Sequence, residues 1–336
     1  MYLEQIKNSI FVSNTKNMKR VASLLVLALL FNSCDDGNLT LETIDFSTAT
    51  TQKCTTNNNI IYKLKEKESL LLDIPESSFV NEPSLVDTPV LLDINTTNRV
   101  VYRFYDGTVA SPTICESIPP ATPIVTDQWT AIAGKIQIFT TAVKTTNATD
   151  NSTKITGYSH NIVFKNITFA KSSGTQVYET FAFGDYVTSA TSLPFGFDKT
   201  LEQCPTSKQI YDNNSSEALT LDIDPTLIVN SATPLNTPRT GLISATVNKL
   251  TYRLFSGLLT SSYFCTSTVP TTPAISEEWI AVAGVSNVSG IIEVTTTSFG
   301  TGFKHTIVLK NVTMKKGNND FKLGDSYLYG ELLTTN

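Results

Sequence analysis

Apolar and polar side chains alternate along several short segments of this chain, which is the pattern of a β-strand with one buried face. In residues 99–107 (RVVYRFYDG), Val100, Tyr102 and Phe104 share one face of the predicted strand. Residues 160–169 (HNIVFKNITF) form another such segment, rich in the β-branched residues that favour strands. Beyond the N-terminal region no window keeps a 3.6-residue apolar period, so we predict an all-β protein.

A third strand is predicted at residues 129–141 (WTAIAGKIQIFTT), where Ile132, Ile136 and Ile138 are expected on one face. Gly134 lies between them, and a glycine inside a strand suits a β-bulge or a close approach of another backbone. Runs rich in Pro, Asn, Thr and Ser separate the predicted strands. This pattern fits an antiparallel β-sandwich and a barrel-like domain equally well.

The chain contains this pattern twice. Residues 99–134 align with residues 249–284 at a constant offset of 150, with 13 identities in 36 positions. The likeness continues on both sides, and residues 140–159 are expected to form a longer loop than their counterpart, 296–304. An internal duplication of this length predicts two tandem homologous domains.

The N-terminal region has the layout of a secretory signal. Lys19 and Arg20 form a positive start, and residues 21–31 are apolar except Ser23. This run is too short for a transmembrane helix, which needs about 20 apolar residues. We therefore expect residues 1–33 to be a signal peptide, with Met18 as an alternative start.

The end of that segment, LLFNSCDDGN, resembles a bacterial lipoprotein signal, in which the cysteine thiol is acylated and becomes the new N-terminus. The cysteine is Cys34, and Phe31 stands where the family usually has Leu. Asp35 and Asp36 resemble the acidic tether of Gram-negative lipoproteins exported to the outer face of the outer membrane. The resemblance implies a lipid-anchored surface protein of the Gram-negative envelope, with the periplasmic face as the alternative location.

These signals divide the chain into four parts. A signal peptide (1–33) precedes a lipidated tether (34–40), and two β domains follow at 41–190 and 191–336. The mature part, of about 300 residues, is long enough for two domains.

Four cysteines remain after Cys34, an even number in an oxidising compartment. The gap from Cys54 to Cys115 is 61 residues, and so is the gap from Cys204 to Cys265. Four cysteines allow three connectivities, and the equal gaps favour Cys54–Cys115 and Cys204–Cys265. A metal site is the rival interpretation, but it would need close ligand spacing such as CxxC, which does not occur.

The charge of the chain argues against polyanionic partners. Residues 1–33 hold four of the 25 basic and one of the 30 acidic residues, so the mature chain has a formal net charge of −8. No Lys/Arg cluster occurs in it, which disfavours nucleic acid and an anionic membrane surface as partners. The membrane contact is expected through the lipid on Cys34 alone.

Two pairs of residues at equivalent positions are weak candidates for ligand binding. His160 and His305 can serve as a general base or metal ligand, although a hydrogen-bonded structural role is favoured for one isolated histidine per domain. Arg103 and Arg253 can clamp a carboxylate or sulfate, although pairing with a neighbouring side chain is favoured.

No pattern in the chain specifies a reaction. The GxSxG and HExxH motifs are absent from the sequence, and a carboxylate pair remains an open alternative. Trp129 and Trp279 are predicted core anchors, with a sugar-stacking platform as the alternative. We predict no catalytic residue, no metal and no cofactor.

The duplication favours a binding role over turnover, because the features that the two copies share are those a fold needs, while their loops differ. The leading hypothesis is a non-enzymatic binding or adhesion module for a glycan or an envelope protein. A structural or accessory envelope protein and a polysaccharide-acting hydrolase are the alternatives.

Overall fold

β-Strands make up 52% of the computed structural model and helices 5%, which confirms the prediction of an all-β protein. The structure describes residues 43–56 and 58–335. The predicted signal peptide, Cys34 and the tether lie outside the described residues. Within the described ranges, no helix is long and apolar enough to cross a membrane.

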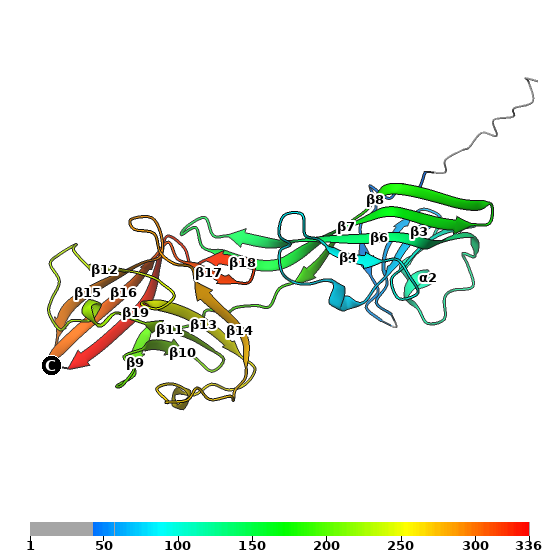
Figure 1. Cartoon of the computed structure of the whole chain (residues 1–336). Coiled ribbons are helices and arrows are strands. Elements are labelled where there is room, and N and C mark those ends of the chain that lie inside the picture. The colour runs from blue at the N-terminus through cyan, green and yellow to red at the C-terminus, as the bar shows by residue number, and fades with distance from the viewer. Residues whose placement is uncertain (1–42, 57, 336) are drawn as a thin grey trace, which may run out of the picture. The chain divides into compact units, whose positions relative to one another are not determined.

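The first of two large sheets contains eight strands among the described residues, in the order β1-β2-β3-β5-β6-β7-β8 with β4 on β6 (Figure 1). Every pair in it is antiparallel. Its elements are β1 (Gln52–Lys53), β2 (Ile61–Lys65), β3 (Glu68–Asp73), η1 (Glu76–Ser78), β4 (Val90–Asp93), β5 (Arg99–Tyr105), α2 (Ser111–Cys115), β6 (Val125–Thr146), β7 (Thr153–Lys171) and β8 (Gly174–Ser189).

The second sheet contains eleven strands in the described part of the chain, in the order β12-β15-β16-β19-β9-β10-β11-β13-β14-β17-β18. The pair β19–β9 is parallel, and the others are antiparallel. Its elements are β9 (Thr200–Gln203), β10 (Ile210–Asn213), β11 (Glu217–Asp222), η2 (Pro225–Leu227), β12 (Arg239–Leu242), β13 (Lys249–Phe255), η3 (Ser261–Tyr263), β14 (Ile275–Ala281), β15 (Ile291–Phe299), β16 (Gly302–Lys310), β17 (Thr313–Lys316), β18 (Asn319–Lys322) and β19 (Ser326–Thr335).

Gly134 allows the backbones of β6 and β7 to approach closely, as predicted. Its φ is +124°, and a Cβ atom at this position would lie 2.8 Å from the Cα of Ile167. The register of β6 against β7 shifts on both sides of Ala133. This irregularity makes one expectation wrong: Ile132 does not share the buried face of Ile136 and Ile138 but is 56% exposed, because the shifts interrupt the alternation of side chains.

The equivalent glycine of the second copy, Gly284, lies where a strand ends. A Cβ atom on Gly284 would lie 2.5 Å from the carbonyl oxygen of Gly290. Here the strand stops, because β14 ends at Ala281 and β15 begins at Ile291. One long strand of the first sheet therefore corresponds to two short strands in the second.

The prediction of a longer loop at residues 140–159 is wrong. Both flanking strands continue into it: β6 runs to Thr146 and β7 starts at Thr153. Both arms contain β-branched residues, such as Val143 and Ile155, which favour strands. The result is a long hairpin with a short turn, and its tip contributes to the candidate site described below.

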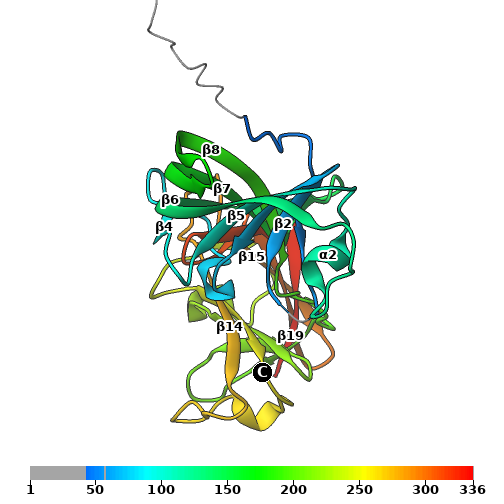
Figure 2. The ribbon, with the colours of Figure 1, turned by 90° about the vertical axis from the view of Figure 1, so that its right-hand side faces the viewer.

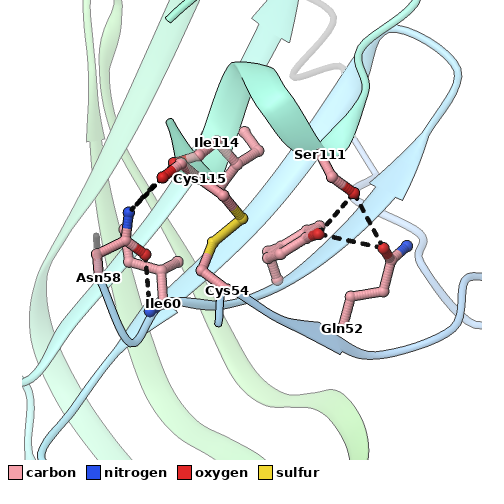
Figure 3. The surroundings of a disulfide bond; sticks show 8 residues. Gln52, Cys54, Asn58, Ile60, Ser111, Ile114 and Cys115 are labelled. Carbon is pink, nitrogen blue, oxygen red and sulfur yellow. Dashed lines mark hydrogen bonds between the residues drawn. A yellow bond between two sulfur atoms is a disulfide. The ribbon is translucent and has the colours of Figure 1, made fainter. Parts of the chain in front are cut away.

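Both predicted disulfides are present. Cys54 is joined to Cys115 and Cys204 to Cys265, each across 61 residues. In the first copy the bond ties the segment before β2 to α2, which lies beside β2 (Figures 2 and 3). Asn58 reinforces this link by donating to the carbonyl oxygens of Ile114 and Cys115 (Figure 3).

Each disulfide covers a small apolar cluster on the outer face of its sheet. In the first copy that cluster contains Val101 and Tyr105 of β5, which explains why both faces of this strand are largely buried. In the second copy Tyr211 stacks on Phe264 with ring centroids 4.2 Å apart. The opposite face of the second sheet forms a larger core that includes Trp279, and Trp129 is likewise buried in the first copy, as predicted for a core anchor.

The two sheets belong to one compact unit, Phe46–Asn336. Several hydrogen bonds join them: Asn318 donates its backbone N–H to Glu82, Lys144 pairs with Asp320 at 2.7 Å, and Lys322 donates its backbone N–H to Thr153. The proposed domain boundary near residue 190 falls between β8 and β9. Independent folding of each half stays a prediction.

Candidate functional site

The His160 ring lies inside the first sheet and is 0% exposed. Its Nδ1 is 2.9 Å from Thr140 Oγ1, and its Nε2 is 2.9 Å from Thr188 Oγ1. The Thr188 hydroxyl donates to Asn81, so its oxygen accepts from Nε2–H. Burial lowers the pKa of His160 from 6.5 to about 4, so the ring is neutral near pH 7 and its Nδ1 accepts from the Thr140 hydroxyl.

His305 occupies the same arrangement in the second sheet. It is also 0% exposed, with Nδ1 2.9 Å from Thr296 and Nε2 3.0 Å from Thr334, whose hydroxyl donates to Asn230. Burial lowers the pKa of His305 as well. In both copies the ring connects strands within a sheet, and neither ring is accessible to a ligand from solvent.

The two candidate arginines also have partners within their own sheets. Arg103 Nε donates to Gln128 at 2.8 Å, and Arg253 Nε pairs with Glu278 at 2.6 Å. The first contact joins β5 to β6, and the second joins β13 to β14, which is the equivalent strand pair of the second copy. The structure does not bring the arginines and histidines together into one site.

A cavity of about 980 Å³ lies between the two sheets. Its walls come from the loop after η1, the tip of the β6–β7 hairpin, the connector at residues 190–195, β14 and the β17–β18 hairpin. The volume is at the upper end of the range of about 300–1,000 Å³ that is typical of ligand pockets. The sequence did not predict this site, because its walls are far apart along the chain.

The connector between the two copies is fixed to the second sheet by Glu217. This carboxylate is fully buried and accepts hydrogen bonds from the backbone N–H of Phe195 and Gly196, from the Asn214 amide and from the Tyr252 hydroxyl. The Phe195 ring stacks on Tyr252 with centroids 4.3 Å apart and an interplanar angle of 9°. Phe195, which lines the cavity, is therefore fixed both by the hydrogen bond of its backbone N–H and by the stacking of its ring.

The charged side chains that line the cavity cancel formally. There are three acidic and three basic ones among the described residues: Glu82, Asp150, Glu277, Lys154, Lys316 and Lys322. The most direct pair is Lys316 with Glu277, at 2.5 Å. The cavity therefore has no net charge to attract an ionic ligand.

Two buried polar atoms of cavity-lining residues lack partners within the described chain: Trp279 Nε1 and Asn319 Oδ1. Trp279 is 4% exposed and Asn319 is 5% exposed. A buried donor or acceptor without a partner costs about 1–3 kcal/mol. Both atoms have almost no accessible surface, so they lie behind the cavity wall rather than in contact with its open space.

The equivalent tryptophan of the first copy shows what Trp279 lacks. Trp129 Nε1 donates to Asp127 at 2.8 Å. The residue at the position of Asp127 in the second copy is Glu277, which pairs with Lys316 instead. The sequence carries a signal of this difference, because DQW in one copy is EEW in the other.

The described residues contain no group of three or more His, Cys, Asp or Glu side chains that could hold a metal ion. The fold and the cavity thus define an all-β protein of two copies, each with its own disulfide, and a charge-balanced pocket between them. No protein-family model, curated protein or solved structure matches the chain.

Proposed function

We propose that this chain is a non-enzymatic binding module, held on the outer membrane of a Gram-negative cell by a lipid on Cys34. The observation that carries the binding role is the cavity of about 980 Å³ between the two copies. Its walls are joined by direct hydrogen bonds such as Asn319 Nδ2 to the Asn81 carbonyl oxygen and Asp325 N–H to the Asp150 carbonyl oxygen. A pocket whose walls are already fixed binds without a large ordering cost.

The surroundings of the cavity support binding rather than turnover. The two histidines, which are the most versatile acid–base groups at neutral pH, are both fully buried within their sheets. Among the carboxylates that line the cavity, Glu277 forms a close ion pair with Lys316. The histidines thus join threonine side chains of neighbouring strands, and the Glu277 carboxylate is part of an ion pair.

The binding role is tested with the mature chain, residues 34–336, carrying Cys34→Ser so that it can be purified without detergent. We expect retention of a defined ligand on a glycan array or in a pull-down from envelope extracts, at a concentration below about 1 mM. Failure of both screens would contradict the proposed binding role.

The location is tested by protease treatment of intact cells, with lysed cells as the control. We expect cleavage of the two β copies on intact cells, since the Cys34 tether would hold them outside. Complete protection on intact cells with cleavage after lysis would place the domains on the periplasmic side.

A second candidate, a structural or accessory envelope protein, is favoured by strand β8. It ends the order of the first sheet, so one edge of this 16-residue strand has no neighbouring strand among the described residues. An edge of this length can accept a strand from a partner. Crosslinking in membranes through a cysteine introduced at Val187 would identify such a partner, and a monomeric product would argue against it.

A further inference from the structure

We propose that His160 and His305 are pH-dependent latches: each neutral ring holds the loop after η1 or η2 against its sheet, and a protonated ring releases it. In the first copy this loop, residues 79–89, contributes to the wall of the cavity and contacts the second sheet. Its release opens that wall. The inference goes beyond the binding role proposed above, and its test needs no ligand.

Hydrogen bonds on both sides of the His160 ring lead to this loop. The ring donates from Nε2 to the Thr188 hydroxyl, which donates in turn to the Asn81 side chain at 2.8 Å. On the other side, Thr140 contacts Nδ1 through its hydroxyl. The backbone N–H of Thr140 donates to the Ser84 hydroxyl at 3.0 Å, and Ser84 N–H donates to the Thr140 carbonyl oxygen at 2.9 Å. Two positions of the loop are therefore tied to residues that contact the ring.

The loop also covers the ring, whose direct contacts among the described residues include no carboxylate. Phe79 packs edge-on against His160 with centroids 5.2 Å apart, and Tyr186 stacks on it at 6.2 Å. Lys53, which interacts with Tyr186, is paired with Glu76 at 2.8 Å. A charged ring is poorly stabilised here, in keeping with burial that lowers its pKa. It gains hydration when the loop moves away, so protonation favours the open loop.

A second cavity, of about 400 Å³, adjoins this latch. Phe79 and Asn81 line it from the loop, and Tyr186 and Thr188 line it from β8. The cavity brings solvent to side chains that contact the ring, although the ring itself is buried. A proton from solvent therefore has a short path to His160.

Release of the loop removes contacts between the two copies. Asn319 Nδ2 donates to the Asn81 carbonyl oxygen at 3.1 Å. Asn318 donates its backbone N–H to the Glu82 carboxylate and its Nδ2 to the Pro83 carbonyl oxygen. Asn81 and Glu82 also line the larger cavity. This part of the cavity wall therefore moves with the loop.

The second copy contains an equivalent latch. His305 Nε2 is bonded to Thr334, whose hydroxyl donates to Asn230, and its Nδ1 is bonded to Thr296. Burial and the nearby Arg239 guanidinium lower the pKa of His305. The loop that this ring holds, residues 228–238, forms no hydrogen bond with the first copy in the described part of the chain. It is therefore an internal control for the loop at residues 79–89.

Proton uptake and loop release are linked equilibria. The His160 ring has a pKa of about 4 under the closed loop, and a ring in contact with water has the ordinary value of 6.5. The open loop is therefore favoured increasingly as the pH falls through this range. Between pH 7 and pH 5 the ratio of open to closed loop should rise about 20-fold.

The test measures hydrogen exchange at two equivalent amides. Ser84 N–H donates to the Thr140 carbonyl oxygen, and Thr233 N–H donates to the Thr296 carbonyl oxygen, each at 2.9 Å. Exchange at each amide requires release of its own loop, so the protection factor reports the ratio of closed to open loop. The mature chain with Cys34→Ser is measured at pH 7 and pH 5, and each rate is corrected for the intrinsic effect of pH on exchange.

We expect the protection factor of Ser84 to fall about 20-fold from pH 7 to pH 5 in the unaltered chain. His160→Gln should remove this fall and leave the fall at Thr233 in place, whereas His305→Gln should do the reverse. Glutamine is the suitable replacement, because its amide accepts at one atom and donates at the other but takes up no proton in this range. The Tyr102 amide of β5, a strand paired on both edges, should keep its protection.

Three results would overturn the proposal. Equal falls at Ser84 in the unaltered chain and in His160→Gln would mean that another group releases the loop. Constant protection at Ser84 would mean that the loop is not released. A fall of the same size at Tyr102 would mean that the chain unfolds as a whole.

If His160→Gln does not fold, the ring itself decides the question. The chain has two histidines, so NMR resolves both ring titrations in untagged protein, and His305→Gln assigns them. Protection at Ser84 should fall over the range in which His160 titrates, and a fall over a different range would contradict the latch. Because no ligand is involved, failure of the latch leaves the binding role standing, and an empty ligand screen leaves the latch standing.

Discussion

Replacing Glu217 with glutamine should destabilise the second sheet by about 3 kcal/mol. The carboxylate oxygens share four donors: Gly196 N–H and Asn214 Nδ2 at Oε1, and Phe195 N–H and Tyr252 Oη at Oε2. Glutamine keeps one oxygen and replaces the other with an NH₂ group, which donates and cannot accept. The Tyr252 hydroxyl can turn to accept from it, but a backbone N–H cannot.

At least one backbone donor therefore loses its acceptor in this fully buried site, at a cost of about 1–3 kcal/mol. The remaining hydrogen bonds also lose the strengthening that an ionised acceptor provides, which adds about 1 kcal/mol. A loss of about 3 kcal/mol is a large part of the 5–15 kcal/mol that a folded protein typically has.

The first copy supplies the matched control. Glu68 is half-buried and accepts from the Tyr102 hydroxyl, which can turn in the same way. Glu68→Gln should therefore cost less than about 1 kcal/mol. Both variants are compared with the unaltered mature chain by urea unfolding at pH 7, followed by circular dichroism, with the free energy taken from the midpoint and slope. Equal losses in the two variants, or a loss below about 1 kcal/mol for Glu217→Gln, would refute the reasoning.

Three further predictions follow from the same structure. Burial lowers the pKa of His160 from 6.5 to about 4, so the unfolded chain takes up this proton first as the pH falls; between pH 6.5 and pH 4 the unaltered chain should lose on the order of 3 kcal/mol more stability than a His160→Gln variant, and equal losses in the two chains would contradict the assignment of a neutral ring. The variant is the necessary reference because burial raises the pKa of Asp212 to about 6, which acts in the opposite direction over the same range. Joint replacement of Cys54 and Cys115 by alanine should lower the free energy of unfolding by about 4 kcal/mol in chemical denaturation, since the bond closes a loop of 61 residues, and an unchanged unfolding midpoint would argue against that account. Cys34→Ser should move the protein from the membrane pellet to the soluble fraction after ultracentrifugation, whereas retention in the pellet would exclude the lipid as its anchor.

Local and periodic features of this protein were readable from its sequence. Alternating side chains located strands such as β5, and equal cysteine gaps gave both disulfides, because a duplicated domain repeats its closed loops at the same length. Gly134 indicated the close approach of β6 and β7, since that backbone conformation excludes a side chain. Alternation failed for Ile132 because a bulge shifts the register, and the bulge depends on the partner strand.

Only the tertiary structure decided where chemistry is possible. Trp129 and Trp279 are equivalent in sequence, yet one indole N–H has a partner and the other has none. The difference arises because Glu277 accepts a hydrogen bond from Lys316, which lies on another strand, 39 residues further along the chain. The cavity likewise joins segments from both copies, and contacts between residues so far apart depend on packing in three dimensions rather than on any local pattern of the chain.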